Sequence, residues 1–155
     1  MSVTMLTAKD ADSFCLLRLR MFEELGDILP SDPEEAVAAF MDANRDYYLS
    51  HTGKDLFCFG VFEDGVMAAT AAICLFNRLP YDKNLSGREA YVLNVYTRPE
   101  FRGRGFAEAL VAEIEKFSEE KGIEKLWLNA SPMGKPLYLK RGFTENPTEM
   151  GEMKN

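Results

Sequence analysis

The chain has 155 residues and a mass of 17.5 kDa, which predicts one domain, because two cores of half this size would each bury too little surface. Apolar residues make up 46% and charged residues 28% of the sequence, a balance that excludes wholesale disorder. The net charge of −7 repels phosphate backbones, so we expect no nucleic-acid partner.

The apolar runs argue against a membrane or secreted protein, and the cysteines argue against a metal site or a disulfide framework. The longest apolar run, residues 66–76, is about half the roughly 20 residues that span a bilayer, and the N-terminal residues lack the apolar core of a signal peptide. We therefore expect a cytoplasmic protein without membrane contact. Cys15, Cys58 and Cys74 lie in apolar runs of a chain with one histidine, which favours buried thiols over a metal site or a disulfide framework.

Two helices are predicted after a short N-terminal strand. Apolar side chains recur at helical spacing over residues 14–25, and Gly26 ends that helix. A second helix then begins at Asp32, Pro33 and Glu35, which supply a capping side chain, a proline at the first helical position and a glutamate at the third.

Strands dominate the middle of the sequence. Residues 56–62 and 66–76 are apolar and rich in aromatic and β-branched side chains, and the Glu-Asp-Gly of residues 63–65 predicts a tight hairpin turn between them. A third strand, residues 90–97, is followed by an amphipathic helix at residues 105–121.

The order of elements indicates the fold class. A strand over residues 125–130 and a short helix over 131–142 follow, and the remaining residues either add an edge strand or fray. With that edge strand the order is β-α-α-β-β-β-α-β-α-β. This order is typical of an α/β protein with a mixed sheet and flanking helices. The unit over residues 90–130 should form a right-handed parallel crossover.

The turn between the third strand and its helix has the chemistry of an anion site. Gly103, Gly105 and Ala107 let the backbone approach a ligand closely, at the point where the first amides of the helix lack acceptors. Arg102 and Arg104 add positive charge, although both side chains would also suit a solvated loop. A pyrophosphate is the natural occupant of such a turn.

These residues resemble a known family. Arg102-x-x-Gly105-x-Ala107 after a strand matches the Arg/Gln-x-x-Gly-x-Gly/Ala motif of the GCN5-related N-acetyltransferases (GNAT), which wraps the pyrophosphate of acetyl-coenzyme A (acetyl-CoA). Residues 137–143 are similar to the family's Leu-Tyr-x-Lys-x-Gly-Phe helix.

The resemblance implies one GNAT domain over residues 1–155. Residues 55–150 would form the cofactor-binding and catalytic core, and residues 1–52 the variable helices on the acceptor side. The implied function is transfer of an acetyl group from acetyl-CoA to a primary amine by direct attack. The implied cofactor-binding residues are Val95, Tyr96, Thr97, Arg102, Gly103, Arg104, Gly105, Phe106, Ala107 and Asn129. Asn129 either contacts the pantetheine arm or only ends its strand.

The resemblance also implies a mechanism. The strand over residues 91–97 would splay from its neighbour at a bulge near Val95 and pair with the pantetheine arm. Tyr138 would then donate a hydrogen bond or a proton to the departing thiolate, whereas without the flanking motif it would be read as a packing tyrosine. Because a phenol near pKa 10 is a weaker acid than a thiol near about 8.5, full proton transfer is uphill by about 2 kcal/mol.

The general base and the acceptor site are left open by the sequence. Glu89 precedes Tyr91 by two residues on one strand face, so Glu89 either acts as the base, directly or through water, or is only solvated. Tyr91 would face the acceptor. Glu23 and Glu24, at the end of the first helix, would suit a cationic acceptor, and an exposed helix face explains them equally well.

Two rival functions and several acceptors remain. A non-catalytic acyl-CoA-binding or sensing module would use the same turn without turnover, and a regulatory protein–protein module would leave the turn empty. Polyamines, amino sugars, amino acids and protein amines all remain possible acceptors. A homodimer is expected by family analogy only.

Overall fold

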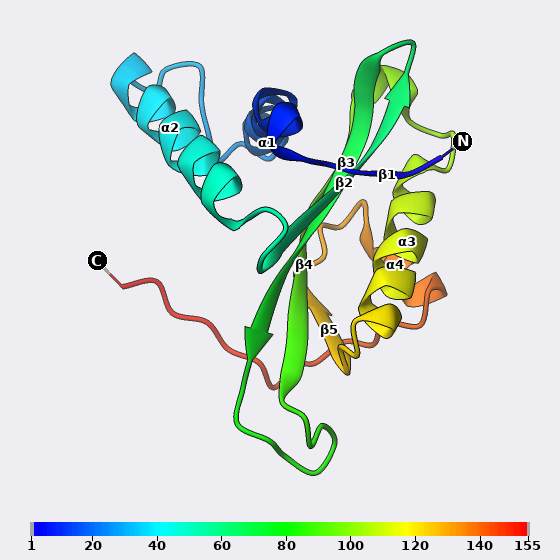
Figure 1. The fold of residues 1–155 in the computed structure, drawn as a ribbon. Helices are drawn as coiled ribbons and strands as arrows, with labels where there is room; N and C mark the ends of the chain where they lie inside the picture. Colours follow the sequence, from blue (N-terminus) through cyan, green and yellow to red (C-terminus); the bar gives the residue numbers. More distant parts are fainter. Residues whose placement is uncertain (1, 155) are drawn as a thin grey trace.

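The computed structural model describes residues 2–154 and contains one five-stranded sheet with helices on both faces (Figure 1). The strands lie in sequence order and have these bounds: β1 Thr4–Met5, β2 Leu56–Glu63, β3 Val66–Asn77, β4 Arg88–Thr97 and β5 Lys125–Leu128. Neighbouring strands pair antiparallel as far as β4, whereas β4 and β5 are parallel. The predicted fold class, a mixed sheet with flanking helices, is confirmed.

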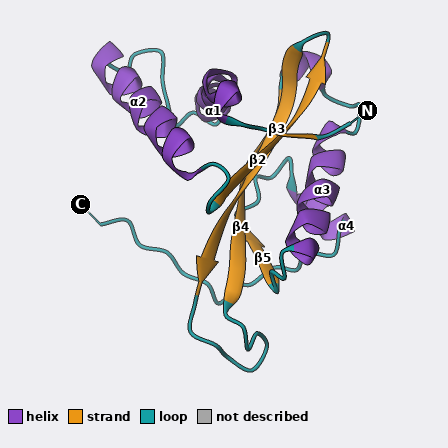
Figure 2. Ribbon diagram, viewed as in Figure 1, coloured by secondary structure: helices purple, strands orange, loops and turns teal. Residues whose placement is uncertain are grey.

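The helices divide between the two faces of the sheet. Their bounds are α1 Ala11–Glu24, α2 Glu34–His51, α3 Phe106–Glu120 and α4 Lys135–Lys140, with single 3-10 turns at Ala8–Asp10 and Pro99–Phe101. Figure 2 shows α1 and α2 on one side and α3 with α4 on the other. Ion pairs from Lys140 and Arg141 to Glu108 hold the end of α4 against α3.

Each face of the sheet carries its own hydrophobic cluster. On one face, Phe106, Leu110, Ile114 and Phe117 of α3 pack against the inward side chains of β2, β3 and β4, which confirms the predicted buried stripe of that helix. On the other face, α1 and Tyr48 of α2 pack against the remaining side chains of the same strands. The central strand β3 therefore has both faces covered over most of its length.

A bulge in β4 shapes the site. Thr70 pairs with Tyr96 and Ala72 with Leu93, so β4 has one more residue than β3 across this interval. Asn94 lies in this bulge, and its φ of 57° is in the left-handed region. Pairing between β4 and β5 ends at Val92, so the last residues of β4 have no strand partner on that side. The predicted bulge and splay are both present.

Two local predictions were wrong. Asp32 does not cap α2, because its Oδ2 accepts the amide proton of Leu29 at 2.8 Å and the helix begins at Glu34. No strand follows α4 within residues 143–154, a polar stretch containing Pro147 and lacking apolar alternation.

The structure also places Cys15 and Cys58 in the core as free thiols. No helix within residues 2–154 has the length and apolar character needed to cross a membrane.

Candidate active site

One cavity of about 890 Å³ opens where β4 separates from β5. Its wall is formed by α1, the last half of β4, the turn leading into α3, and the segment from the end of β5 through α4. The cavity therefore brings together the two sequence motifs, which are distant in the chain. Four of the predicted contact residues, Val95, Tyr96, Thr97 and Asn129, line its β4 and β5 sides.

The turn before α3 presents a row of free backbone amides. Gly103 and Gly105 have φ values of 80° and 81°, a conformation that glycine adopts without strain. The amides of residues 103–108 donate to no protein acceptor among residues 2–154. Together with the positive end of the α3 dipole, this row forms a nest for an anion. Gly103, Gly105, Phe106 and Ala107 all line the cavity.

The two arginines of the turn have different positions. Arg102 donates from both terminal nitrogens to the carboxylate of Glu24, at 2.7 and 2.6 Å, and from Nε to the carbonyl of Thr97 at 2.9 Å. These bonds lower the pKa of Glu24. Arg104 is exposed, and its guanidinium lies 5.3 Å from the ring centre of Phe101, outside the cavity wall. The charge of Arg102 is thus already neutralised, and the amides are the main donors available to a phosphate.

The structure changes the interpretation of the two helix-end glutamates. Glu24 lines the cavity, but its carboxylate is occupied by Arg102. Glu23 lies outside the cavity wall and pairs with Arg20 at 3.1 Å on the exposed side of α1. Neither carboxylate is therefore free to receive a cationic acceptor. Of the two explanations that the sequence left open, the exposed helix face fits Glu23.

Tyr138 projects into the cavity from α4. Its side chain is 8% exposed, and its ring packs edge-on against Phe143 with centroids 5.8 Å apart. Gly134 leaves room for this ring, since a Cβ at that position would lie 3.0 Å from Tyr138 Cε2. The hydroxyl makes no hydrogen bond within residues 2–154, and burial raises the pKa of the phenol. The group is therefore a positioned hydrogen-bond donor and a poor acid.

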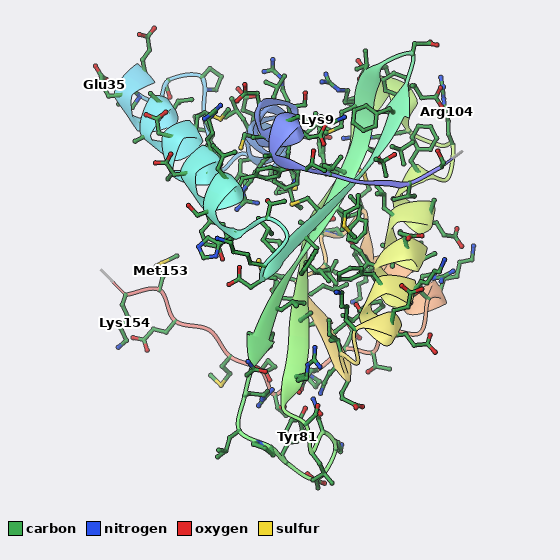
Figure 3. The ribbon with its side chains drawn as sticks, viewed as in Figure 1. Lys9, Glu35, Tyr81, Arg104, Met153 and Lys154 are labelled. Atoms are coloured by element: carbon green, nitrogen blue, oxygen red, sulfur yellow. The ribbon has the colours of Figure 1, made fainter. Side chains whose placement is uncertain are left out.

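Glu89 lies away from the other predicted site residues, and it is not the solvated carboxylate that was one of the two alternatives. The residue is 1% exposed and lies outside the cavity wall, although Tyr91 on the same strand lines it. Its carboxylate accepts hydrogen bonds from four side chains: Trp127 Nε1 at 2.7 Å, Tyr81 Oη at 2.8 Å, Asn84 Nδ2 at 3.1 Å and Arg78 Nη1 at 3.4 Å. Figure 3 shows Tyr81 at the end of the sheet opposite Arg104, which marks the turn before α3. This carboxylate instead ties the β3–β4 loop to β5.

The sequence analysis missed the polar group at the other end of the cavity. Arg18 lines the cavity from α1, and its Nη1 donates to Asn94 Oδ1 at 3.2 Å. A signal was available, because Arg18 follows Phe14 by four residues and precedes Met21 by three, which places a charge inside the buried stripe of the helix.

Comparisons with known proteins identify the family. The sequence pattern of the acetyltransferase (GNAT) family matches residues 19–143. The chain belongs to the GNAT family. The prediction drawn from residues 102–107 and 137–143 is thereby confirmed.

Solved structures agree with this GNAT assignment over nearly the whole chain. A predicted acetyltransferase with acetyl-CoA from Clostridium acetobutylicum superposes with a TM-score of 0.84 at 26% identity, covering 98% of this chain and 95% of that one. A GCN5-related N-acetyltransferase from Ralstonia eutropha JMP134 has a TM-score of 0.84 at 28% identity, covering 99% and 97%.

One curated GNAT relative matches over a shorter stretch. Glucosamine 6-phosphate N-acetyltransferase from Trypanosoma brucei brucei is 32% identical over 60 residues, which are 39% of this chain and 41% of the relative. The match thus spans about two fifths of that relative's length.

Proposed function

We propose that this GNAT protein transfers the acetyl group of acetyl-CoA to a primary amine by direct attack. The observation that carries the proposal is the meeting of three features in one cavity: the row of free amides at residues 103–108, the unpaired end of β4 and the hydroxyl of Tyr138. The relative named for glucosamine 6-phosphate acetylation and the neighbour described with acetyl-CoA support the same reaction.

The chain would hold the cofactor at two places. The amides of residues 103–108 donate to the pyrophosphate, where the α3 dipole also favours negative charge. The pantetheine arm lies along the β4 residues beyond Val92, which have no partner strand on that side. This placement directs the thioester toward the bulge at Asn94 and Val95.

The chemical step needs an unprotonated amine. Its nitrogen attacks the thioester carbonyl carbon, the carbon–sulfur bond breaks, and the thiolate leaves with a hydrogen bond from Tyr138. The proton that the attacking nitrogen loses passes to water or to the departing thiolate, so that the products are the amide and free coenzyme A. Burial raises the pKa of that phenol further above the thiol's, so donation of a hydrogen bond is favoured over complete proton transfer. Backbone N–H groups beside the bulge would stabilise the developing oxyanion.

The structure offers no unpaired carboxylate as a general base within the described cavity wall. Glu24 is paired with Arg102, and Glu108 with Lys140 at 3.3 Å. We therefore propose that the acceptor enters as the free amine. The rate should then rise with pH until the acceptor's own amine has lost its proton, which for an α-amino group lies near about pH 8.

The proposal is tested by measuring free thiol release from acetyl-CoA in the presence of pooled amines. Thiol release that depends on an added amine supports it. Tight binding of acetyl-CoA without amine-dependent release would instead favour the non-catalytic sensing module, and no binding at all would favour the protein–protein module. A cytoplasmic location and a homodimer stay predictions, which cell fractionation and gel filtration would check.

A further inference from the structure

Arg18 places a positive charge in the cavity with hydrogen-bonding capacity to spare. It is half-buried on α1, donates from Nε to Asn44 Oδ1 at 2.7 Å and from Nη1 to Asn94 Oδ1 at 3.2 Å. A guanidinium has five N–H groups, so three of them have no acceptor among residues 2–154. The unused donors belong to a residue that lines the cavity.

No negative charge compensates Arg18. No carboxylate within the described residues forms an ion pair with it. Burial lowers its pKa, and the acidic groups that act on it are the thiols of Cys74, Cys15 and Cys58. Burial raises the pKa of all three thiols, so they are neutral at pH 7. A half-buried guanidinium without a counter-charge is costly, which makes the position informative.

Asn94 provides an independent second observation beside Arg18. It lines the cavity, is 5% exposed, and occupies the left-handed position of the β4 bulge. Its Nδ2 is buried without an acceptor within residues 2–154, while its Oδ1 is taken by Arg18. Buried polar groups are nearly always paired, so an amide without an acceptor next to a cation without a counter-charge indicates a missing acceptor group.

The phosphates of the cofactor do not supply this acceptor. Glu24 marks the phosphate end of α1 through its bonds to Arg102. Arg18 lies six residues earlier, about 9 Å along the helix. Met21 and Phe22 line the cavity between them, and neither side chain carries a charge or a hydrogen-bonding group; Cζ of Arg18 lies over the face of the Phe22 ring, 4.8 Å from its centre. A second anion must therefore come from another molecule.

We propose that the acceptor amine carries an anionic group, a carboxylate or a phosphate, which Arg18 binds with Asn94 beside it. This inference rests on the proposed function and specifies its substrate class. The planar guanidinium suits both anions, because it can donate two parallel hydrogen bonds to either. The apolar side chains of Met21, Phe22 and Leu25 would contact the remainder of the acceptor.

The test uses acceptors that differ only in the anion. L-Methionine is compared with L-methioninamide, and glucosamine 6-phosphate with glucosamine, at equal concentrations of the unprotonated amine. We expect the anionic member of one pair to have a kcat/KM on the order of 10- to 100-fold higher, as charged hydrogen bonds provide. The pair that shows the preference distinguishes a carboxylate from a phosphate.

Variants of α1 then assign the preference to its residue. Arg18→Met should abolish the preference for the anionic acceptor. It should lower kcat/KM for that acceptor and leave kcat/KM for the uncharged analogue within about threefold of the wild-type value. Arg18→Lys should retain part of the preference. Arg20→Met is the matched control, because Arg20 carries the same charge on the same helix but pairs with Glu23 outside the cavity. An equal loss for both members of a pair in Arg18→Met would mean a structural role and would overturn the inference.

Binding of the acetylated products separates this inference from the proposed function. With coenzyme A present, N-acetylmethionine is titrated against its amide, and N-acetylglucosamine 6-phosphate against N-acetylglucosamine. Tighter binding of one anionic product, lost in Arg18→Met, supports the anion site even if no amine releases thiol. Equal or absent binding of both members of both pairs overturns it, even if an uncharged amine is acetylated.

Discussion

Replacing Glu89 by glutamine separates a structural role from a catalytic one. Oε1 accepts hydrogen bonds from Trp127 and Arg78, and Oε2 accepts them from Tyr81 and Asn84. A glutamine amide has the same shape but only one oxygen and no charge. Its NH₂ group would face the two donors that Oε2 now serves.

The loss of stability in Glu89→Gln depends on which of the hydrogen-bond donors around residue 89 can reorient. The Tyr81 hydroxyl can rotate its proton away and accept instead. Asn84 cannot turn its amide round, because its Oδ1 already accepts from Ser86 Oγ at 2.8 Å and from Gly87 N at 3.2 Å. One buried donor is thus left unpaired and the others lose a charged partner. These losses sum to about 2–4 kcal/mol of the free energy of unfolding, or about 5–15 °C in Tm.

Urea unfolding at pH 7 measures this loss in Glu89→Gln. Glu120→Gln is the matched control, since Glu120 is exposed at the end of α3 and forms no ion pair within residues 2–154, and its midpoint should be unchanged. Turnover is measured at a temperature where each variant is folded. We expect kcat of Glu89→Gln within about threefold of the wild type, because Glu89 lies outside the cavity wall.

The pH dependence gives a second signature. Burial raises the pKa of Glu89, but the hydrogen bonds from Trp127, Tyr81, Asn84 and Arg78 outweigh it and leave the pKa lowered. The ionised carboxylate therefore stabilises the fold above the unfolded-state pKa of about 4.3, and this stabilisation is lost as pH falls through the folded-state pKa. The gap between wild type and Glu89→Gln should narrow below about pH 4. Equal midpoints at pH 7, or normal stability with a 100-fold fall in kcat, would refute the structural role.

Three further predictions concern the cavity. Acetyl-CoA at one hundred times its Kd should add about 2.7 kcal/mol of stability, and a thermal scan without a shift at millimolar cofactor would contradict binding at residues 103–108. Gly105→Val should weaken acetyl-CoA binding at least tenfold in calorimetric titration, whereas Gly53→Val, which has a similar left-handed φ of 85° away from the cavity, should cost stability alone. Tyr138→Phe should lower kcat on the order of 10- to 100-fold and leave the affinity for acetyl-CoA within a few-fold of the wild-type value. A near-normal kcat under conditions where chemistry limits the rate would remove the hydroxyl from the mechanism. Tyr47→Phe, at an exposed tyrosine, is the control.

Local patterns predicted the elements and the conformation of the glycine turn before α3 well, because their causes lie within a few residues. The hairpin at residues 63–65 needs two left-handed positions, which Asp64 and Gly65 provide with φ values of 50° and 78°. The free amides at residues 103–108 follow from two glycines before a helix. Such features depend on backbone geometry that neighbouring residues determine.

The roles of the charged residues could not be predicted in the same way, because their partners come from distant segments. Glu89 meets Trp127, which is 38 residues away, and Glu24 meets Arg102, which is 78 residues away. A strand-start glutamate is exposed in isolation and becomes buried only when the β3–β4 loop folds over it. The Asp32 cap predicted for α2 fails for a different and local reason, because Asp32 Oδ2 accepts the amide proton of Leu29 before the helix begins.

The net charge of the chain disfavours anionic ligands, whereas the hydrogen-bond donors in its cavity favour them. A net charge of −7 disfavours anions at long range, but salt screens that field beyond about 8 Å at physiological ionic strength. Within the cavity, Glu24 cancels Arg102, while the amides of residues 103–108 and the guanidinium of Arg18 keep donors without partners. The two groups of donors lie at opposite ends of one groove. A ligand set with negative charge at each end and an uncharged reacting centre between them fits this arrangement, and acetyl-CoA with an anionic amine is such a set.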